Sequence, residues 1–132
     1  MVYMLIDKKK ITVLIADDAP EISARLTDAV LEVNGVELIG TVTDGDKAWQ
    51  LIAAFKPDSV ILDLQMPGLS GFELLKLIRR FLPTTLVIIL TAYDSPQFRE
   101  RCEQYGADYF LSKPDEFDRI PNILQARINK TQ

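Results

Sequence analysis

Acidic residues stand at the ends of two apolar runs of the chain. Asp17 and Asp18 follow the run Ile11–Ala16, and Asp63 follows the run Asp58–Leu62. If both runs are parallel strands of an open α/β sheet, their carboxyl ends meet where such sheets bind ligands. Three carboxylates gathered there would repel one another. A hard cation relieves that repulsion, and Mg²⁺ favours a few carboxylate oxygens together with carbonyls and waters.

Two further polar side chains are expected at the same edge. Thr91 ends the run Leu86–Leu90, and Lys113 follows the run Ala107–Leu111. A hydroxyl and an ammonium group can both bind phosphoryl oxygens. A carboxylate can attack a phosphoryl group and form an aspartyl phosphate, after which positioning and charge neutralisation govern the transfer. Any one of these aspartates could simply cap a helix or turn, but that interpretation does not explain the full set.

The elements that must position these residues alternate along the chain. Short apolar or β-branched runs are separated by segments with helical spacing or helix caps, which predicts a parallel sheet covered on both faces. The fold is therefore expected to be a three-layer, doubly wound α/β domain. The predicted strands are Ile11–Ala16, Val36–Val42, Asp58–Leu62, Leu86–Leu90 and Ala107–Leu111, and the predicted helices lie at Ile22–Val33, Asp46–Phe55, Ser70–Phe81, Phe98–Tyr105 and after Asp118.

The start of the last helix needs care, because Pro121 would break a helix interior. If Asp118 is the N-cap, Pro121 falls harmlessly in the first turn. We therefore expect one irregular turn over Asp115–Phe117 before this helix.

Length and composition indicate one globular domain. The chain has 132 residues, 48% of them hydrophobic and 26% charged, which predicts a single core over about residues 10–128 after a lead-in at 1–9. A net charge of −4 argues against direct contact with nucleic acid or an anionic membrane. No apolar run approaches the length of a membrane span, and neither a signal peptide nor an internal disulfide is expected with Cys102 as the one cysteine, so the cytoplasm is predicted.

The chain contains no histidine. This excludes histidine-based catalytic triads, histidine-ligated zinc and a phosphohistidine on the chain itself. Any phosphoryl donor must therefore be another molecule.

The polar residues form an ordered pattern that resembles the signature of response-regulator receiver domains of two-component signal transduction, in particular chemotaxis-like regulators. The residues that carry the resemblance are Asp17-Asp18, Asp63-Leu64-Gln65-Met66-Pro67 with Gly71, Thr91-Ala92 and Lys113-Pro114. Their order and spacing match the family from about Lys10 to Ile128. The resemblance implies a flavodoxin-like, five-stranded parallel sheet with strand order 2-1-3-4-5.

The resemblance also implies a role for each of these residues. Asp63 would be the phosphoacceptor, and Thr91 with Lys113 would hold the phosphoryl oxygens. Asp18, Asp63 and the Gln65 backbone carbonyl would bind Mg²⁺, or alternatively Mn²⁺, and Asp17 would join through water.

A switch and its tuning are implied in the same way. Thr91 would shift toward the phosphate and Phe110 would rotate inward, although Phe110 can also be read as a plain core aromatic. Ala92 is small and would leave the site open to a donor. Gln65 and Tyr93 would set the lifetime of the phosphorylated state.

The output surface implied by the resemblance covers the fourth helix, fifth strand and fifth helix. It could mediate homodimerisation or contact a downstream protein partner or an attached effector domain. The residues predicted on it are Gln97, Arg101, Gln104, Asp108 and the exposed side of 118–127.

The expected function is a phosphorylation-activated switch that receives its phosphoryl group from a sensor histidine kinase or a phosphotransfer protein. It would catalyse only its own phosphorylation and dephosphorylation, and so is not expected to be an enzyme. One alternative is a receiver that acts only as an interaction module. A haloacid-dehalogenase-type phosphatase would need an aspartate where Gln65 stands, and a flavodoxin-like FMN carrier would need a Ser/Thr/Gly-rich loop where Asp17 and Asp18 stand.

Overall fold

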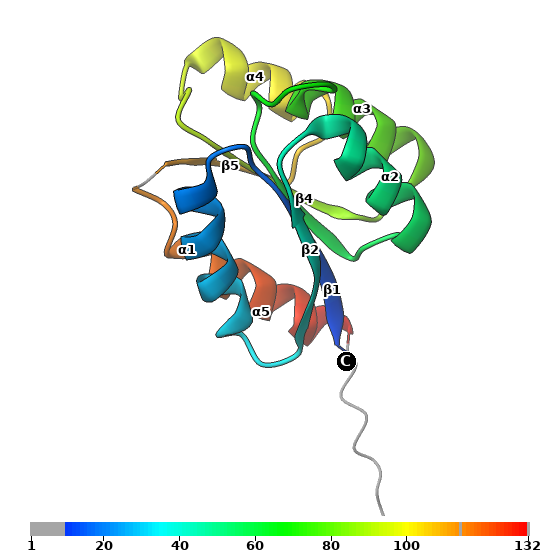
Figure 1. Cartoon of the computed structure of the whole chain (residues 1–132), viewed down its shortest axis with the longest axis vertical. Helices are drawn as coiled ribbons and strands as arrows, with labels where there is room; N and C mark the ends of the chain where they lie inside the picture. The colour runs from blue at the N-terminus through cyan, green and yellow to red at the C-terminus, as the bar shows by residue number, and fades with distance from the viewer. Residues whose placement is uncertain (1–9, 114, 132) are drawn as a thin grey trace, which may run out of the picture.

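Five parallel strands form one sheet with the order β2-β1-β3-β4-β5 (Figure 1). The computed structural model describes residues 10–113 and 115–131. The predicted lead-in at 1–9 and Pro114 of the Lys113-Pro114 motif lie outside the described residues. The predicted fold class and strand order are confirmed.

The ten elements alternate as predicted, and most ends move by one or two residues. The strands are β1 Ile11–Ala16, β2 Val36–Val42, β3 Ser59–Leu62, β4 Leu86–Thr91 and β5 Tyr109–Ser112, and the helices are α1 Pro20–Leu31, α2 Gly45–Phe55, α3 Gly71–Phe81, α4 Pro96–Gln104 and α5 Arg119–Thr131. Strand β5, for example, begins two residues after the predicted Ala107. The Ala107 amide donates to the Cys102 carbonyl at 2.9 Å, so Ala107 still belongs to the turn that ends α4.

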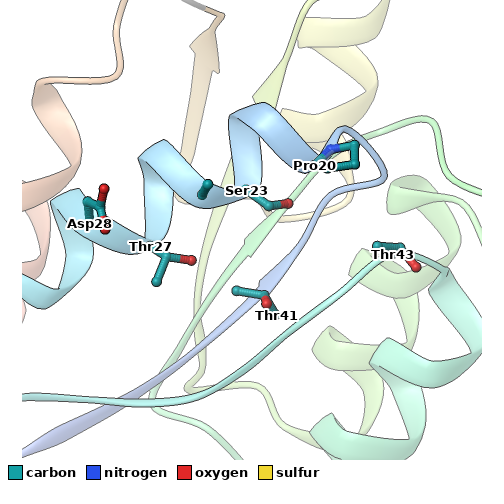
Figure 2. Close-up of a pocket in the computed structure, with 7 residues that line it drawn as sticks. Pro20, Ser23, Thr27, Asp28, Thr41 and Thr43 are labelled. Carbon is teal, nitrogen blue, oxygen red and sulfur yellow. The ribbon is translucent and has the colours of Figure 1, made fainter.

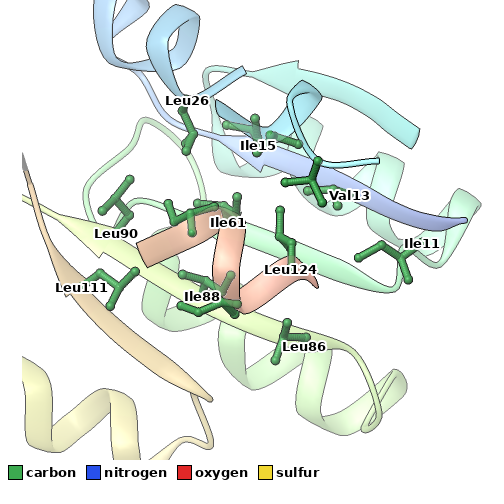
Figure 3. Packing of buried hydrophobic residues seen from close by; sticks show 14 of the residues in the cluster. Ile11, Val13, Ile15, Leu26, Ile61, Leu86, Ile88, Leu90, Leu111 and Leu124 are labelled. Carbon is green, nitrogen blue, oxygen red and sulfur yellow. The ribbon is translucent and has the colours of Figure 1, made fainter. Parts of the chain in front are cut away.

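Alternate strand residues face two separate hydrophobic layers, as the pleat of a strand requires. Helices α1 and α5 cover one face of the sheet, and α2, α3 and α4 cover the other (Figure 1). Val13, Ile15 and Ile61 point toward the first pair of helices (Figure 3). Leu14 and Val60 point toward the other three. Every residue of β3 and β4 is buried, which confirms strands covered on both faces.

Local capping explains several of the helix ends. Ser70 and Glu73 form the predicted capping box at the start of α3. Ser95 accepts a hydrogen bond from the Phe98 amide at the start of α4. These caps fix where each helix begins.

The entry to α5 is irregular, as predicted. The Arg119 amide donates to the Glu116 carbonyl at 3.1 Å, and the Ile120 amide donates to the Phe117 carbonyl at 3.2 Å. The regular helix then starts at Arg119, which leaves Pro121 in the first turn. In the described part of the chain, none of the helices has the length and apolar character needed to cross a membrane.

Candidate functional site

Three carboxylates meet at the carboxyl edge of the sheet. Strands β1 and β3 are parallel neighbours with Ala16 opposite Leu62, so the residues that follow them come side by side. The carboxylate oxygens of Asp17, Asp18 and Asp63 lie within 4.8 Å of one another. Asp17 and Asp63 are buried, whereas Asp18 is exposed. The structure thus brings together the acids that the sequence placed at two strand ends.

Lys113 supplies the positive charge of this cluster. Its ammonium group forms an ion pair with the Asp17 carboxylate and lies 3.1 Å from Asp63 Oδ2. Only 7% of the Lys113 side chain is exposed, so both contacts are largely shielded from water. The lysine amide also donates to the Thr91 carbonyl at 2.9 Å. One cation is therefore held between two buried anions.

The Asp63 carboxyl group is in an unfavourable place for its charge. Burial raises its pKa above the usual value, and the negative charge of Asp17 acts in the same direction. The ion pair and hydrogen bond with Lys113 oppose this rise without cancelling it. A further cation beside Asp63 would stabilise the ionised form.

Backbone contacts fix the direction of the carboxylates. Asp17 Oδ1 accepts a hydrogen bond from the Ala19 amide at 2.9 Å. Asp63 Oδ1 lies 3.4 Å from the Gln65 amide, a long and therefore weak contact. The Asp63 amide donates to the Ala16 carbonyl at 2.9 Å. This hydrogen bond links the carboxyl ends of β1 and β3 directly.

The donor set of this cluster fits a hard divalent cation. Carboxylate oxygens from Asp17, Asp18 and Asp63 converge on one region, and oxygen ligands of this kind suit Mg²⁺ or Mn²⁺. Asp18 is exposed and leaves room for waters in the coordination shell. The residues present therefore fit the metal that the sequence predicted.

Thr91 ends β4 beside the cluster and is fully buried. Its Oγ1 accepts a hydrogen bond from the Tyr93 amide at 3.1 Å. A threonine hydroxyl has one hydrogen to donate, and this arrangement leaves that hydrogen for another acceptor. Gln65, Ala92 and Tyr93 are all exposed, as expected for residues that a donor or water could reach.

Phe110 is buried, with 7% of the residue exposed. The Arg99 guanidinium lies 4.6 Å from the centre of its ring, and Arg99 Nη1 donates to the Phe110 carbonyl at 3.3 Å. The aromatic ring that the sequence identified as a switch therefore sits beneath a cation from α4.

The predicted output surface needs one correction. Gln97, Arg101 and Gln104 are all exposed on α4 as expected, but the Arg101 guanidinium lies 4.1 Å from the centre of the Phe72 ring, on the side of α4 that faces α3. Arg99 faces β5 instead. A groove of about 520 Å³ runs along this side and is lined by Arg99, Glu103, Ala107, Asp108, Tyr109, Phe110, Leu111 and Arg119.

The sequence missed Arg99 for a physical reason. Helix α4 has the sequence PQFRERCEQ, in which Phe98 and Cys102 are the apolar residues that indicate the buried side of the helix. Such a short apolar stripe leaves the direction of each arginine uncertain. The usable signal was that Arg99 and Glu103 are four residues apart and so share a face.

A second hollow, of about 440 Å³, lies between α1 and β2 (Figure 2). Its lining is made of Pro20, Ser23, Ala24, Thr27, Asp28, Thr41 and Thr43. These are mainly hydroxyl and methyl groups with a single carboxylate. The hollow therefore lacks the grouped charges of the first site.

Comparisons with known proteins agree with this geometry. The family model of the response regulator receiver domain matches residues 13–125. The chain is 29% identical over 116 residues to the DNA-binding transcriptional activator EvgA of Escherichia coli K12, which covers 88% of this chain and 56% of EvgA. It is 36% identical over 107 residues to protein-glutamate methylesterase/protein-glutamine glutaminase 3 of Geobacter sulfurreducens, covering 80% of this chain and 28% of that protein. The chain thus spans about half the length of EvgA and less of the methylesterase.

One solved structure is similar to this chain over nearly the whole length of both. The receiver domain of Francisella response regulator 1452 superposes with a TM-score of 0.82 and 32% identity, covering 93% of this chain and 100% of that one.

Proposed function

Because the chain belongs to the family of response regulator receiver domains, we propose that it is a phosphorylation-activated switch with Asp63 as the phosphoacceptor. The phosphoryl group would come from a sensor histidine kinase or a phosphotransfer protein. Residues 1–132 would act as a single receiver domain whose chemistry is limited to its own phosphorylation and dephosphorylation.

One observation carries the proposal: the charged groups around Asp63 have the arrangement that phosphoryl transfer to a carboxylate needs. Asp17, Asp18 and Asp63 cluster within 4.8 Å, and the Lys113 ammonium contacts two of them. Thr91 stands next to them with a hydroxyl hydrogen left to donate. A structural ion pair alone would not require a third acid and a buried hydroxyl at the same edge.

The chain's own residues would divide the work of transfer. An Asp63 carboxylate oxygen forms the new bond to phosphorus while the phosphorus–nitrogen bond of a phosphohistidine donor breaks, and the donor nitrogen keeps that electron pair and takes up a proton. Lys113 and Thr91 bind phosphoryl oxygens and hold them in line. Asp18, Asp63 and the Gln65 carbonyl would hold Mg²⁺, with Asp17 joining through water, and the bound ion would supply positive charge to balance the phosphoryl oxygens.

Return to the resting state would use the exposed rim of the site. Gln65, Ala92 and Tyr93 are exposed, so they control how water reaches the aspartyl phosphate. These side chains would set the lifetime of the phosphorylated state.

The output would be a change on the α4–β5–α5 surface. A phosphoryl group adds about −1.5 to −2 charges beside Thr91, which biases a packing arrangement already open to the domain. Thr91 and Phe110 would shift, and the groove along Arg99 and Arg119 would change with them. This surface would then bind a downstream protein, an attached effector domain or a second copy of the chain.

Intact mass after incubation with Mg²⁺ and acetyl phosphate tests the proposal. Wild type should gain the mass of one phosphoryl group, labile to acid and base, and Asp63→Asn should gain none. Asp28→Asn is the matched control, because Asp28 is exposed on α1, and it should be phosphorylated like wild type. Absence of an adduct on wild type, together with no beryllofluoride response by NMR, would reduce the chain to an interaction module.

A further inference from the structure

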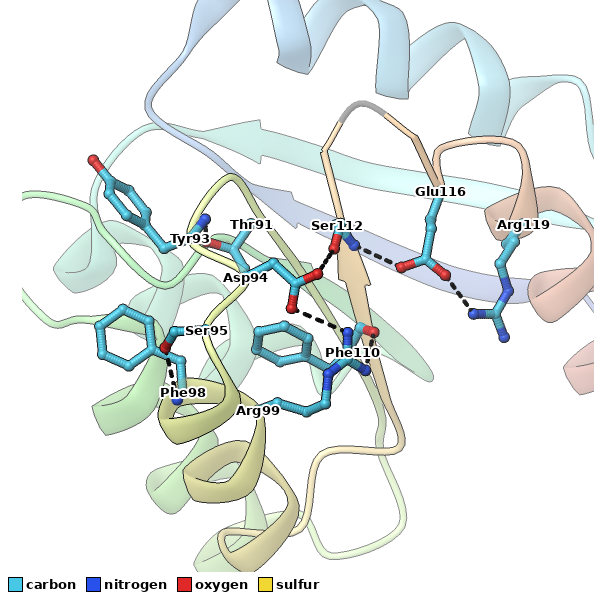
Figure 4. A network of polar contacts seen from close by, with 10 residues as sticks. All are labelled: Thr91, Tyr93, Asp94, Ser95, Phe98, Arg99, Phe110, Ser112, Glu116 and Arg119. Carbon is cyan, nitrogen blue, oxygen red and sulfur yellow. Dashed lines mark hydrogen bonds and ion pairs between the residues drawn. The ribbon is translucent and has the colours of Figure 1, made fainter.

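One carboxylate links the loop after β4 to the end of β5, beside the site. Asp94 lies in the loop between β4 and α4, and Ser112 is the last residue of β5. The Ser112 hydroxyl donates a hydrogen bond to Asp94 Oδ2, and Arg99 Nη2 donates to Asp94 Oδ1 at 3.2 Å (Figure 4). We call these three side chains the Asp94 clasp.

The clasp joins the segments that deliver Thr91 and Lys113 to the site. Strands β4 and β5 are paired with Thr91 opposite Ser112. Asp94 lies in the loop that follows Thr91, and Ser112 directly precedes Lys113. A displacement of Thr91 or Lys113 can therefore change the contacts of the clasp.

Contacts from the clasp continue to both helices of the output surface (Figure 4). On one side, Arg99 covers the Phe110 ring and donates to the Phe110 carbonyl. On the other, the Ser112 amide donates to Glu116 Oε1 at 2.9 Å, and Glu116 Oε2 pairs with Arg119 at 2.8 Å. Both Arg99 and Arg119 line the groove on the α4–β5–α5 surface.

Phe110 cannot make a polar link of its own, because its side chain has no hydroxyl. A polar connection between the site and this surface must therefore use other side chains, and the clasp supplies one. The pKa of Asp94 lies below its usual range because of the Ser112 hydrogen bond and, next, the Arg99 contacts. The carboxylate that holds the clasp is therefore ionised near neutral pH.

We propose that Asp94 is a positioning residue that couples occupancy of the phosphoryl site to the α4–β5–α5 surface, acting through Ser112 and Arg99. The inference rests on the proposed function, since it concerns how the same site is read. Asp94 and Arg99 are both substantially exposed, and an exposed ion pair adds little to stability. The clasp is therefore a means of transmitting position, and its loss should leave the fold intact.

Amide chemical shifts during titration with Mg²⁺ and beryllofluoride, a phosphoryl mimic, test this directly. In wild type, shifts should appear both at the site, around Asp63 and Ala92, and on the surface, at Arg99, Leu111 and Arg119. In Asp94→Ala the site shifts should persist, whereas the surface shifts should fall by about twofold or more. Ser112→Ala should give the same loss, and the double variant should lose no more than either single one.

Two variants control for charge and for size. Glu100→Ala removes the same charge from an exposed position on α4 outside the clasp, and it should keep the wild-type surface shifts. Ser112→Thr retains the hydroxyl and should restore coupling. Full surface shifts in Asp94→Ala would overturn the inference while leaving the proposed function intact. A lack of any site shift in wild type would instead overturn both.

Discussion

Replacing Asp63 with asparagine should make the metal-free protein more stable. Asp63 is buried beside two other carboxylates with one ammonium group as its counter-charge. At an effective dielectric constant of about 20, two like charges within 4.8 Å of each other repel by about 3.5 kcal/mol or more, and the attraction to Lys113 at 3.1 Å returns about 5.4 kcal/mol. Burial of the charge adds the largest unfavourable contribution, so we expect a net cost on the order of 1–2 kcal/mol, which Asp63→Asn removes.

The pH dependence of this difference has a definite sign. Burial raises the pKa of Asp63 in the folded state, so the folded protein holds that proton more tightly than the unfolded chain. Below the unfolded pKa the acid is neutral in both states, and wild type and Asp63→Asn should be similar. As the pH rises from the unfolded pKa through the raised pKa of the folded state, wild type loses stability relative to the variant. The full difference should be present once the pH is above the raised pKa of the folded state.

Urea unfolding followed by circular dichroism, with EDTA and then with Mg²⁺, measures this. Without metal the variant should have the larger free energy of unfolding. Mg²⁺ at about 100 times its dissociation constant should stabilise wild type by about 2.7 kcal/mol, and the variant less, because it has lost a ligand. Asp28→Asn should change stability by less than about 0.5 kcal/mol. The reasoning is refuted if metal-free Asp63→Asn is no more stable than wild type at neutral pH.

Three further perturbations test the geometry around the site. Lys113→Ala leaves Asp17 and Asp63 buried without their counter-charge. In urea titrations of the metal-free protein, this should lower the free energy of unfolding by about 3–5 kcal/mol. A loss under about 1 kcal/mol would contradict the two ion pairs. Gly71→Ala should lower thermal stability by about 1–3 kcal/mol, because a Cβ there collides with the Asp63 carbonyl oxygen; an unchanged melting temperature would contradict that contact. Cys102 is fully buried, and burial raises the pKa of its thiol to about 11. Ellman's reagent should therefore label this thiol only after the protein unfolds. Rapid labelling of the native protein would be inconsistent with this packing.

The strands and the acid cluster could be predicted because each depends on local signals. Strands β1, β3 and β4 are apolar along nearly all of their length, because both of their faces are buried. Ser70 and Glu73 mark the start of α3 through a contact made within one turn. Once the strands are parallel, Asp17 and Asp63 must meet, because they follow neighbouring strands that end at the same edge.

Contacts between loops could not be predicted in the same way. The Asp94 clasp exists because β4 and β5 are paired with Thr91 opposite Ser112, and the register of a pair is not written in either strand alone. The opposite directions of Arg99 and Arg101 depend on which side of the weakly apolar α4 packs on the sheet. In both cases the local sequence allows several arrangements, and tertiary packing determines which one forms.

The backbone around Asp63 explains why the repulsion at the site persists in the folded protein. The Gly71 amide donates to the Leu64 carbonyl at 3.0 Å, and the Gly45 amide donates to the Pro67 carbonyl at 2.9 Å. Neither glycine has space for a Cβ, because the backbone of the loop after Asp63 fills that space. The first residues of two helices therefore hold this loop, which limits how far Asp63 can move away from Asp17 and Asp18. Under the proposed function, a bound cation would relieve the repulsion between these carboxylates. Because α2 and α3 keep the loop after Asp63 in place, that repulsion persists without metal, and metal binding at the edge of β1 and β3 is stronger as a result.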